Sequence, residues 1–356
     1  MTNKRNLKSL GAGCVLFVGS ACGQLLDPVP DVTAARETAD VESVGDAADD
    51  PAIWINEANP AASRILGTDK QSGLHVYDLG GESVQFLPTG KVNNVDLRQG
   101  VALGANGSDQ IGTPWAGDVA VASNRSDNTV AVYDIDADGI VSQIGSFASA
   151  LVEPYGICLG VTDGNVIAFV TYKSGDLIAY RLTGPSSAVV DGQIKLDSQL
   201  EGCVYDDETE MLYVGEEEKG IWTSVYRAGE FTTPVLVDEV DAASGIRADV
   251  EGLAIYRDPN GPDFLIASSQ GNNSFAVYAL ESGEFLGRFR LAEGDAIDGA
   301  EDTDGIEATS VALSEAFPRG VLIVQDGFNK PKGSPQNFKI IDWREIEGVL
   351  ASAAAE

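Results

Sequence analysis

The chain has 356 residues, and 44% of them are hydrophobic, which is enough to build a large core and excludes disorder as the main state. Its 55 acidic residues outnumber 23 Lys and Arg residues, and the net charge of -32 disfavours nucleic acid and anionic lipid as partners. Such a surplus of carboxylates favours hard divalent cations, calcium first. The single histidine excludes most zinc enzymes, whose sites usually use several.

Residues 1–22 have the pattern of a signal peptide, with basic residues ahead of a short apolar run over residues 11–18. The run is too short to span a bilayer as a helix. Two interpretations stay open. Cys22 follows small residues as a lipidated cysteine does in bacterial lipoproteins, although Gly19 stands where such signals usually carry Leu; ordinary cleavage near Ala21 is the alternative. Both predict an exported protein that is periplasmic, anchored to the outer membrane or secreted.

Residues 23–48 are poor in apolar side chains and are predicted to begin as a linker, whereas residues 49–343 contain a repeat. A short strand pattern recurs about every 50 residues. Two apolar segments precede each copy, and a looser one follows all but the last. Four strands per unit predict an all-β fold, a six-bladed β-propeller of four-stranded antiparallel blades. The six copies are GLHVYD, TVAVYD, DLIAYR, WTSVYR, SFAVYA and NFKIID.

The sixth unit lacks a fourth strand, because residues 344–356 have the composition of a helix and a short tail. We expect the missing strand to come from the segment between Thr33 and Gly45. Pairing the first and last segments of the chain would close the ring and remove two free sheet edges.

Polar residues recur at one position of the repeat. In an up-and-down blade, the start of the first strand and the end of the second lie on the same face, so these residues should surround the central axis. The first three units place Lys70, Arg125 and Lys173 there, which suits phosphate. The last three units place oxygen ligands there, which suit several calcium ions. These ligands are Glu201, Glu216, Glu217, Asp249, Glu251, Gln270, Asp298, Asp304, Glu307 and Asp326, with Asp50 beside them across the closure.

Several other features of potential chemical interest are given structural interpretations. Cys158 and Cys203 could pair, but both lie in apolar runs and no disulfide framework is evident, so buried thiols are favoured. His75 lies in an alternating strand and is predicted to pack inside it. The segment DIDADG resembles the start of an EF-hand loop, but Gly145 stands where the twelfth-position Glu is required, so a hairpin turn is predicted. The tyrosines that recur in the repeat are predicted to be packing residues.

Motifs along nearly the whole mature chain carry a family likeness. The chain resembles the β-propeller phytases, calcium-dependent bacterial 3-phytases that hydrolyse myo-inositol hexakisphosphate (phytate). The matching stretches, in order, are DDPAIW, K-SGL-VYD, NNVDLR, ASNRS, EGCVYDDE, EEEKGIW, DVEGLAIY, ASSQGNNS-A-Y, DTDGIE, QDG-N and QNFK-I-W.

The resemblance implies roles for individual residues. Phosphate binding is implied for Lys70, Arg125, Tyr155 and Lys173. Active-site calcium is implied for Glu201, Glu217, Asp249, Glu251, Gln270 and Asp304, and catalytic roles for Lys70, Arg125, Glu217 and Asp304. A deeper, stabilising calcium is implied for Asp50, the Val95 carbonyl, Asp298 and Asn329. Ser174 and Phe328 depart from the family pattern, where acids are usual.

The implied reaction is in-line attack on phosphorus by a water made more acidic by several Ca2+ ions, without a covalent intermediate. Histidine phosphatases and Cys-x5-Arg phosphatases are excluded, because only His75 exists and neither Cys158 nor Cys203 has Arg six positions on. Two alternatives remain: a calcium-dependent propeller hydrolase acting on another ester or lactone, and a non-catalytic periplasmic binding propeller. We expect a monomer whose partner is a small molecule, phytate as its calcium complex. We expect no nucleic acid partner. Contact with a membrane is expected only through an N-terminal lipid anchor.

Overall fold

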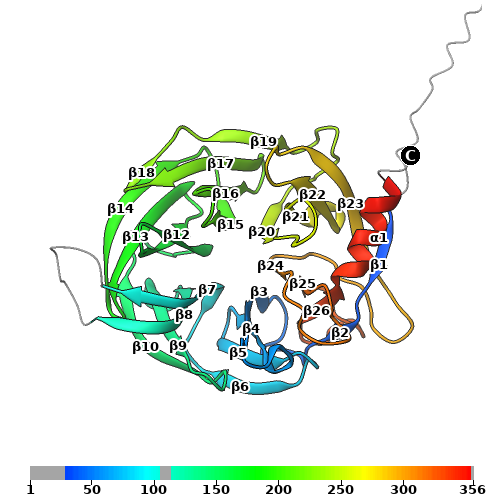
Figure 1. Ribbon diagram of the computed structural model, residues 1–356, viewed down its shortest axis with the longest axis horizontal. Helices are drawn as coiled ribbons and strands as arrows, with labels where there is room; N and C mark the ends of the chain where they lie inside the picture. Colours follow the sequence, from blue (N-terminus) through cyan, green and yellow to red (C-terminus); the bar gives the residue numbers. More distant parts are fainter. Residues whose placement is uncertain (1–28, 105–113, 354–356) are drawn as a thin grey trace, which may run out of the picture.

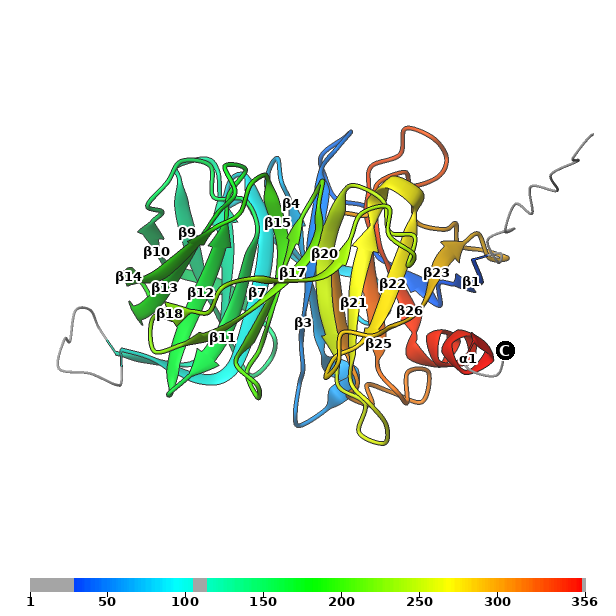
Figure 2. The same cartoon turned by 90° about the horizontal axis from the view of Figure 1, so that it is seen from above.

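The computed structural model describes residues 29–104 and 114–353, and the expected signal peptide lies outside them. The described strands form six sheets that radiate from a common axis (Figure 1), and the disc they form is seen edge-on in Figure 2. The predicted six-bladed β-propeller is therefore confirmed. No helix in the described ranges combines the length and the apolarity needed to cross a membrane.

The first three blades each contain four antiparallel strands that follow one another in the chain. Blade 1 consists of β3 (Ala48–Trp54), β4 (Arg64–Asp69), β5 (Gly73–Asp78) and β6 (Ser83–Leu87), with the short helix η1 (Pro60–Ala62). Blade 2 consists of β7 (Val92–Leu103), β8 (Trp115–Asn124), β9 (Thr129–Ile135) and β10 (Val141–Ala148). Blade 3 consists of β11 (Ile157–Thr162), β12 (Asn165–Thr171), β13 (Asp176–Gly184) and β14 (Ser187–Lys195).

The last three blades follow the same plan with additions at their outer edges. Blade 4 consists of β15 (Leu200–Asp206), β16 (Met211–Glu216), β17 (Gly220–Arg227), β18 (Glu230–Phe231) and β19 (Val235–Glu239). Blade 5 consists of β20 (Val250–Tyr256), β21 (Phe264–Ser269), β22 (Ser274–Ala279) and β23 (Phe285–Ala292), with the short helix η2 (Gln270–Asn272). Blade 6 contains β24 (Ile306–Thr309), β25 (Val321–Asp326) and β26 (Asn337–Asp342).

The second and third strands of most blades are buried along nearly their whole length, because each blade is sandwiched between two neighbours. Every residue of β21 is buried, and β12 is buried except at its first residue. Such strands are nearly continuous apolar runs rather than alternating ones. The recurring tyrosines lie in this core as predicted: Tyr77, Tyr133, Tyr180, Tyr226 and Tyr278 are all buried.

The two local predictions outside the ring of polar residues also agree with the structure. His75 is buried in β5, and burial lowers the pKa of its imidazole. The segment DIDADG forms the turn between β9 and β10, where the Asp136 carboxylate accepts hydrogen bonds from the backbone N–H groups of Asp138 and Ile140, both at 2.9 Å.

The N-terminal segment closes the ring as predicted. Strand β2 (Arg36–Glu37) pairs antiparallel with β26 and supplies the fourth strand of blade 6. The preceding strand β1 (Asp31–Thr33) was not predicted; it pairs parallel with β23 on the edge of blade 5. The segment therefore joins two neighbouring blades (blue in Figure 1). The predicted C-terminal helix is α1 (Trp343–Ala353), which packs against β1 and β23.

One sequence interpretation is wrong. Cys158 and Cys203, expected to be free thiols, form a disulfide with a Cα–Cα distance of 5.7 Å. They lie in β11 and β15, the innermost strands of blades 3 and 4. Apolar surroundings are common to buried thiols and to buried disulfides, so the local sequence could not distinguish the two. The pairing depends on the packing of two different blades.

A buried ammonium strengthens the closure. The Lys339 side chain in β26 is fully buried and contacts the carboxylates of Glu37 at 2.6 Å, Asp326 at 3.2 Å and Asp298. Because Glu37 belongs to β2, this cluster joins the N-terminal segment to the last blade.

Replacing Lys339 by Met should lower the free energy of unfolding by about 3–5 kcal/mol, because it leaves buried carboxylates without a counter-charge. The matched control is Lys330→Met: among the described residues, the exposed Lys330 forms an ion pair with the exposed Glu293 alone, and its loss should be close to unmeasurable. Urea unfolding at neutral pH compares the two variants. Equal losses would contradict the role given to the buried cluster.

Candidate functional site

A cationic cavity lies on one face of the propeller, where second strands end. Its volume is about 550 Å³. Lys70 directly follows β4 and Arg125 directly follows β8, so the ends of consecutive blades place both cations at the same rim. The lining residues are Asp46, Lys70, Gln71, Lys91, Arg125, Glu153, Tyr155 and Lys173. The structure thus brings together all four residues expected to bind phosphate.

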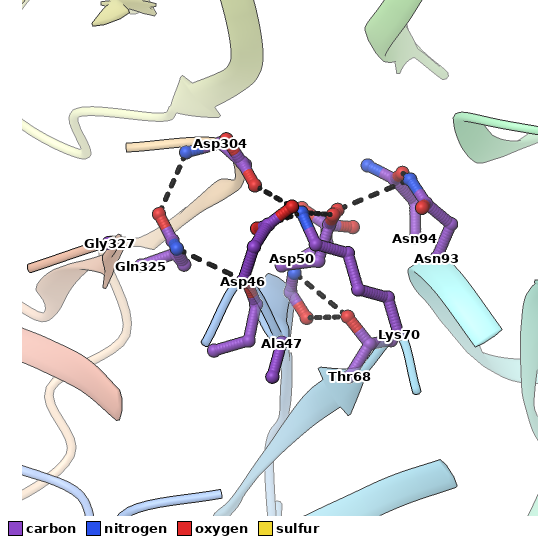
Figure 3. Close-up of polar contacts among 12 residues, drawn as sticks. Asp46, Ala47, Asp50, Thr68, Lys70, Asn93, Asn94, Asp304, Gln325 and Gly327 are labelled. Carbon is purple, nitrogen blue, oxygen red and sulfur yellow. Dashed lines mark hydrogen bonds and ion pairs between the residues drawn. The ribbon is translucent and has the colours of Figure 1, made fainter. Parts of the chain in front are cut away.

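Lys70 is held by carboxylates from two blades and the N-terminal segment. Its ammonium lies 2.7 Å from Asp46, 3.0 Å from Asp49 and 2.8 Å from Asp304. Figure 3 shows Asp46 and Asp304 converging on it. Burial alone would lower the pKa of Lys70, but Asp49 and Asp304 outweigh burial and raise it. This lysine is therefore a fixed positive charge between blades 1 and 6.

The other two predicted cations flank one aromatic ring. The Lys173 ammonium lies 4.2 Å from the centre of the Tyr155 ring, and the Arg125 guanidinium lies 5.9 Å from it. Among the described residues neither cation is in an ion pair, so both are available to an anion. Burial and the carboxylate of Glu201 raise the pKa of the Tyr155 phenol, which keeps it a hydrogen-bond donor.

Three buried carboxylates form the core of the acidic half. Glu201 and Glu251 are the second residues of β15 and β20, and Glu217 directly follows β16. One oxygen from each lies within 4.8 Å of the others. Burial, and then repulsion from neighbouring acids, raises the pKa of Glu201 to about 7. Burial and repulsion from Asp249 raise the pKa of Glu217 to about 7, although the hydrogen bond from Gln199 acts in the opposite direction and lowers it.

The remaining ligands implied for the active-site calcium lie around Asp304. The Gln270 amide donates a hydrogen bond to the Asp304 carboxylate at 2.7 Å. The Asp304 N–H donates to the Gln325 side chain at 2.8 Å, a contact shown in Figure 3. Asp249 is half-buried and its carbonyl accepts the Gln270 N–H at 3.0 Å. Asp304 contacts both Lys70 and Gln270 and therefore links the cationic half to the acidic half.

The four residues expected to hold a deeper calcium fall into two groups of contacts. Asp50 accepts a hydrogen bond from the Val95 N–H at 3.0 Å and borders a cavity of about 20 Å³, roughly the space of one water molecule. Asp298 and Asn329 instead lie around the Lys339 ammonium. The two pairs surround different centres, so an ion at either would have a different ligand set.

The sequence interpretation missed two residues that belong to the site, Lys91 and Asp46. Lys91 lines the cationic cavity, and its carbonyl accepts the Arg125 N–H at 2.8 Å. Asp46 contacts Lys70 from the loop before β3. Asn93 lies near the start of β7, the position that defines the polar ring; it is fully buried and donates to Glu201 at 2.9 Å and to Asp49 at 3.4 Å. Lys91 directly precedes β7, the first strand of blade 2. The recurrence of polar residues at the starts of first strands could therefore have identified it.

The two positions that depart from the family pattern are also placed. The Ser174 hydroxyl donates to Asp176 at 2.5 Å and does not line the cavity. Phe328 is exposed, next to the loop that carries Asn329.

The fold and the site together define a propeller hydrolase of phosphate esters. A family model described as Phytase matches residues 24–354. The chain is 40% identical over 331 residues to the 3-phytase of Bacillus subtilis (strain 168), covering 88% of this chain and 84% of that one. A solved structure of a functionally unknown protein from Desulfotomaculum acetoxidans DSM 771 is 16% identical, with a TM-score of 0.46 over 67% of this chain and 70% of that one. The chain belongs to the phytase family and is a phosphoric monoester hydrolase.

In the absence of metal, the protein should lose stability as the pH rises from about 4.5 to about 7. Glu201 and Glu217 bind protons more tightly when folded than when unfolded, so their protonated forms stabilise the fold and ionisation removes that stability. We expect a loss of at least about 1.4 kcal/mol, the value of one pKa unit.

Urea unfolding in EDTA at pH 5 and pH 8 measures this loss. The double variant Glu201→Gln with Glu217→Gln should show a smaller difference between the two pH values, with the remainder coming from buried acids such as Glu251 and Glu307, whose pKa values burial also raises. A wild-type protein that is equally stable at both would contradict the assignment.

Proposed function

We propose that this protein removes phosphate groups from phytate and that the reaction depends on calcium held by its acidic half. The observation that carries the proposal is the position of Glu201, Glu217 and Glu251, whose oxygens lie within 4.8 Å of one another on the face that bears the cationic cavity. A substrate that fills the cavity can therefore contact cations bound to the carboxylates.

The donor set fits calcium. Its charged ligands are carboxylates, and Gln270 adds an amide oxygen, which are the ligands that calcium prefers. Glu251 has a buried oxygen, Oε2, without a hydrogen-bond partner, and burial with repulsion from Glu201 raises its pKa well above the usual value. A bound cation would relieve both conditions. His75, the one histidine, is inside blade 1 and takes no part.

When bound, calcium would neutralise charge on phosphate oxygens and make a nearby water more acidic. The chain's own residues bind and orient the ester. Arg125 can donate two parallel hydrogen bonds to one phosphate, and Lys173 adds a second positive charge beside it. The Tyr155 hydroxyl can donate to a phosphate oxygen. Lys70 lies between the two halves and can stabilise charge that develops on the transferred phosphoryl group.

The substrate is proposed to be phytate as its calcium complex, because a net-negative protein holds a polyanion best through shared cations. The same proposal includes a stabilising calcium near Asp50. Asp298 and Asn329, which contact Lys339, are also proposed as ligands of a stabilising calcium. Export from the cell, with or without a lipid anchor at Cys22, also remains a proposal.

Lys70→Ala and Glu217→Ala should each lower kcat for phytate by about 100-fold or more, since each removes a charge aimed at the reacting phosphate. Phosphate release is measured with Ca2+ and with EDTA, and EDTA should abolish it in the wild type. The matched control is Lys195→Ala, because Lys195 pairs with Asp176 outside the cavity. Full activity of the wild type in EDTA would refute calcium dependence, and no release from folded wild type in calcium would refute the phytase proposal.

Lys91→Ala should raise KM for phytate several-fold and leave kcat/KM for p-nitrophenyl phosphate nearly unchanged. Lys91 is exposed at the rim, and no described residue forms an ion pair with it, so it can contact a phosphate group other than the one being removed. Equal losses on both substrates would place Lys91 at the reacting group instead.

A further inference from the structure

We propose that the Cys158–Cys203 disulfide positions the active site by fixing Tyr155 against Glu201, where the cationic half meets the acidic half. The inference rests on the proposed function, because it assigns phosphate binding to one half and calcium binding to the other. It concerns the geometry of the site and is separate from the stability that any cross-link adds.

The two halves of the site meet at two junctions between blades. At the junction of blades 6 and 1, the Lys70 ammonium contacts Asp304 and Asp49, so a network of charges joins the halves. At the junction of blades 3 and 4, no ion pair joins the two blades within the ranges that the structure describes. The disulfide is the covalent connection at this second junction.

The cross-link lies close to the groups that it would position. Cys158 is three residues after Tyr155, and Cys203 is two residues after Glu201. The backbones also approach closely here: a Cβ atom added to Gly156 would lie 1.9 Å from the Glu201 carbonyl oxygen, and the Thr171 hydroxyl donates to that oxygen at 2.8 Å. A small slide of β11 along β15 would therefore change the distance between the phenol and the carboxylate.

The cross-link is itself part of the buried interior. The Cys158 and Cys203 side chains are 1% and 9% exposed, so the bond is shielded from solvent and holds the inner strands of blades 3 and 4 together inside the fold.

The test compares wild type with a double variant, Cys158→Ala with Cys203→Ala, at a temperature well below unfolding. We expect kcat for phytate to fall by about 3-fold to 10-fold, because misplaced groups lose rate steeply. KM should change by less than about 2-fold, since the cations of blades 1–3 keep their own arrangement. Calorimetry of Ca2+ binding, which needs no substrate, should show dissociation constants weakened several-fold.

The matched control is Leu212→Ala. Leu212 is fully buried in the same apolar cluster between blades 3 and 4, but it lies at the opposite end of its strand from Glu217. This variant should lose stability by creating a cavity and keep both kcat and calcium affinity. If the double variant behaves like Leu212→Ala, losing stability alone, the positioning role is refuted.

A second variant, Cys158→Val with Cys203→Val, restores the lost volume without the bond and should show the same change in kcat and calcium affinity as the alanine pair. If neither pair folds, folded wild type is treated with reductant until thiol titration shows that the Cys158–Cys203 bond is open, and calcium calorimetry is carried out before and after. Unchanged affinity with both thiols titrated overturns the proposal. A wild type that binds calcium but leaves phytate intact would refute the proposed function, while the calorimetric comparison would still test the positioning role.

Discussion

Repulsion among buried carboxylates is the constraint on which the site depends. Glu201, Glu217 and Glu251 come from neighbouring blades to the same place, where burial raises the pKa of each. A protein that only needed to fold would gain nothing from this arrangement. It becomes favourable when a cation binds between the carboxylates, so the stability of the propeller and the chemistry of the site are linked.

The propeller makes this arrangement possible because every blade brings the same two strand ends to one face. Three blades contribute cations and three contribute oxygen ligands, so the site has two distinct sides. Closure preserves the arrangement. Lys70 connects blade 1 to blade 6 through Asp304, and Lys339 joins the N-terminal segment to blade 6 through Glu37.

The sequence predicted the fold and most of the site because both follow from a repeat. A residue such as Arg125 is recognised by its position in the unit, and the structure places it where that position implies. Contacts between different blades were not predictable in this way. The disulfide between Cys158 and Cys203 spans 45 residues and joins the innermost strands of blades 3 and 4. Asp46 was missed because it precedes the first strand and lies outside the repeat.

The most direct test of the account is a crystal structure grown with calcium and phosphate. The account predicts cations about 2.3–2.6 Å from oxygens of Glu201, Glu217 and Glu251, with phosphate between these ions and Arg125 and Lys173. Density for calcium only near Asp50 or Asp298, with an empty carboxylate cluster at saturating calcium, would contradict it. In that case the buried acids would need another counter-charge, and the proposed calcium chemistry would be wrong.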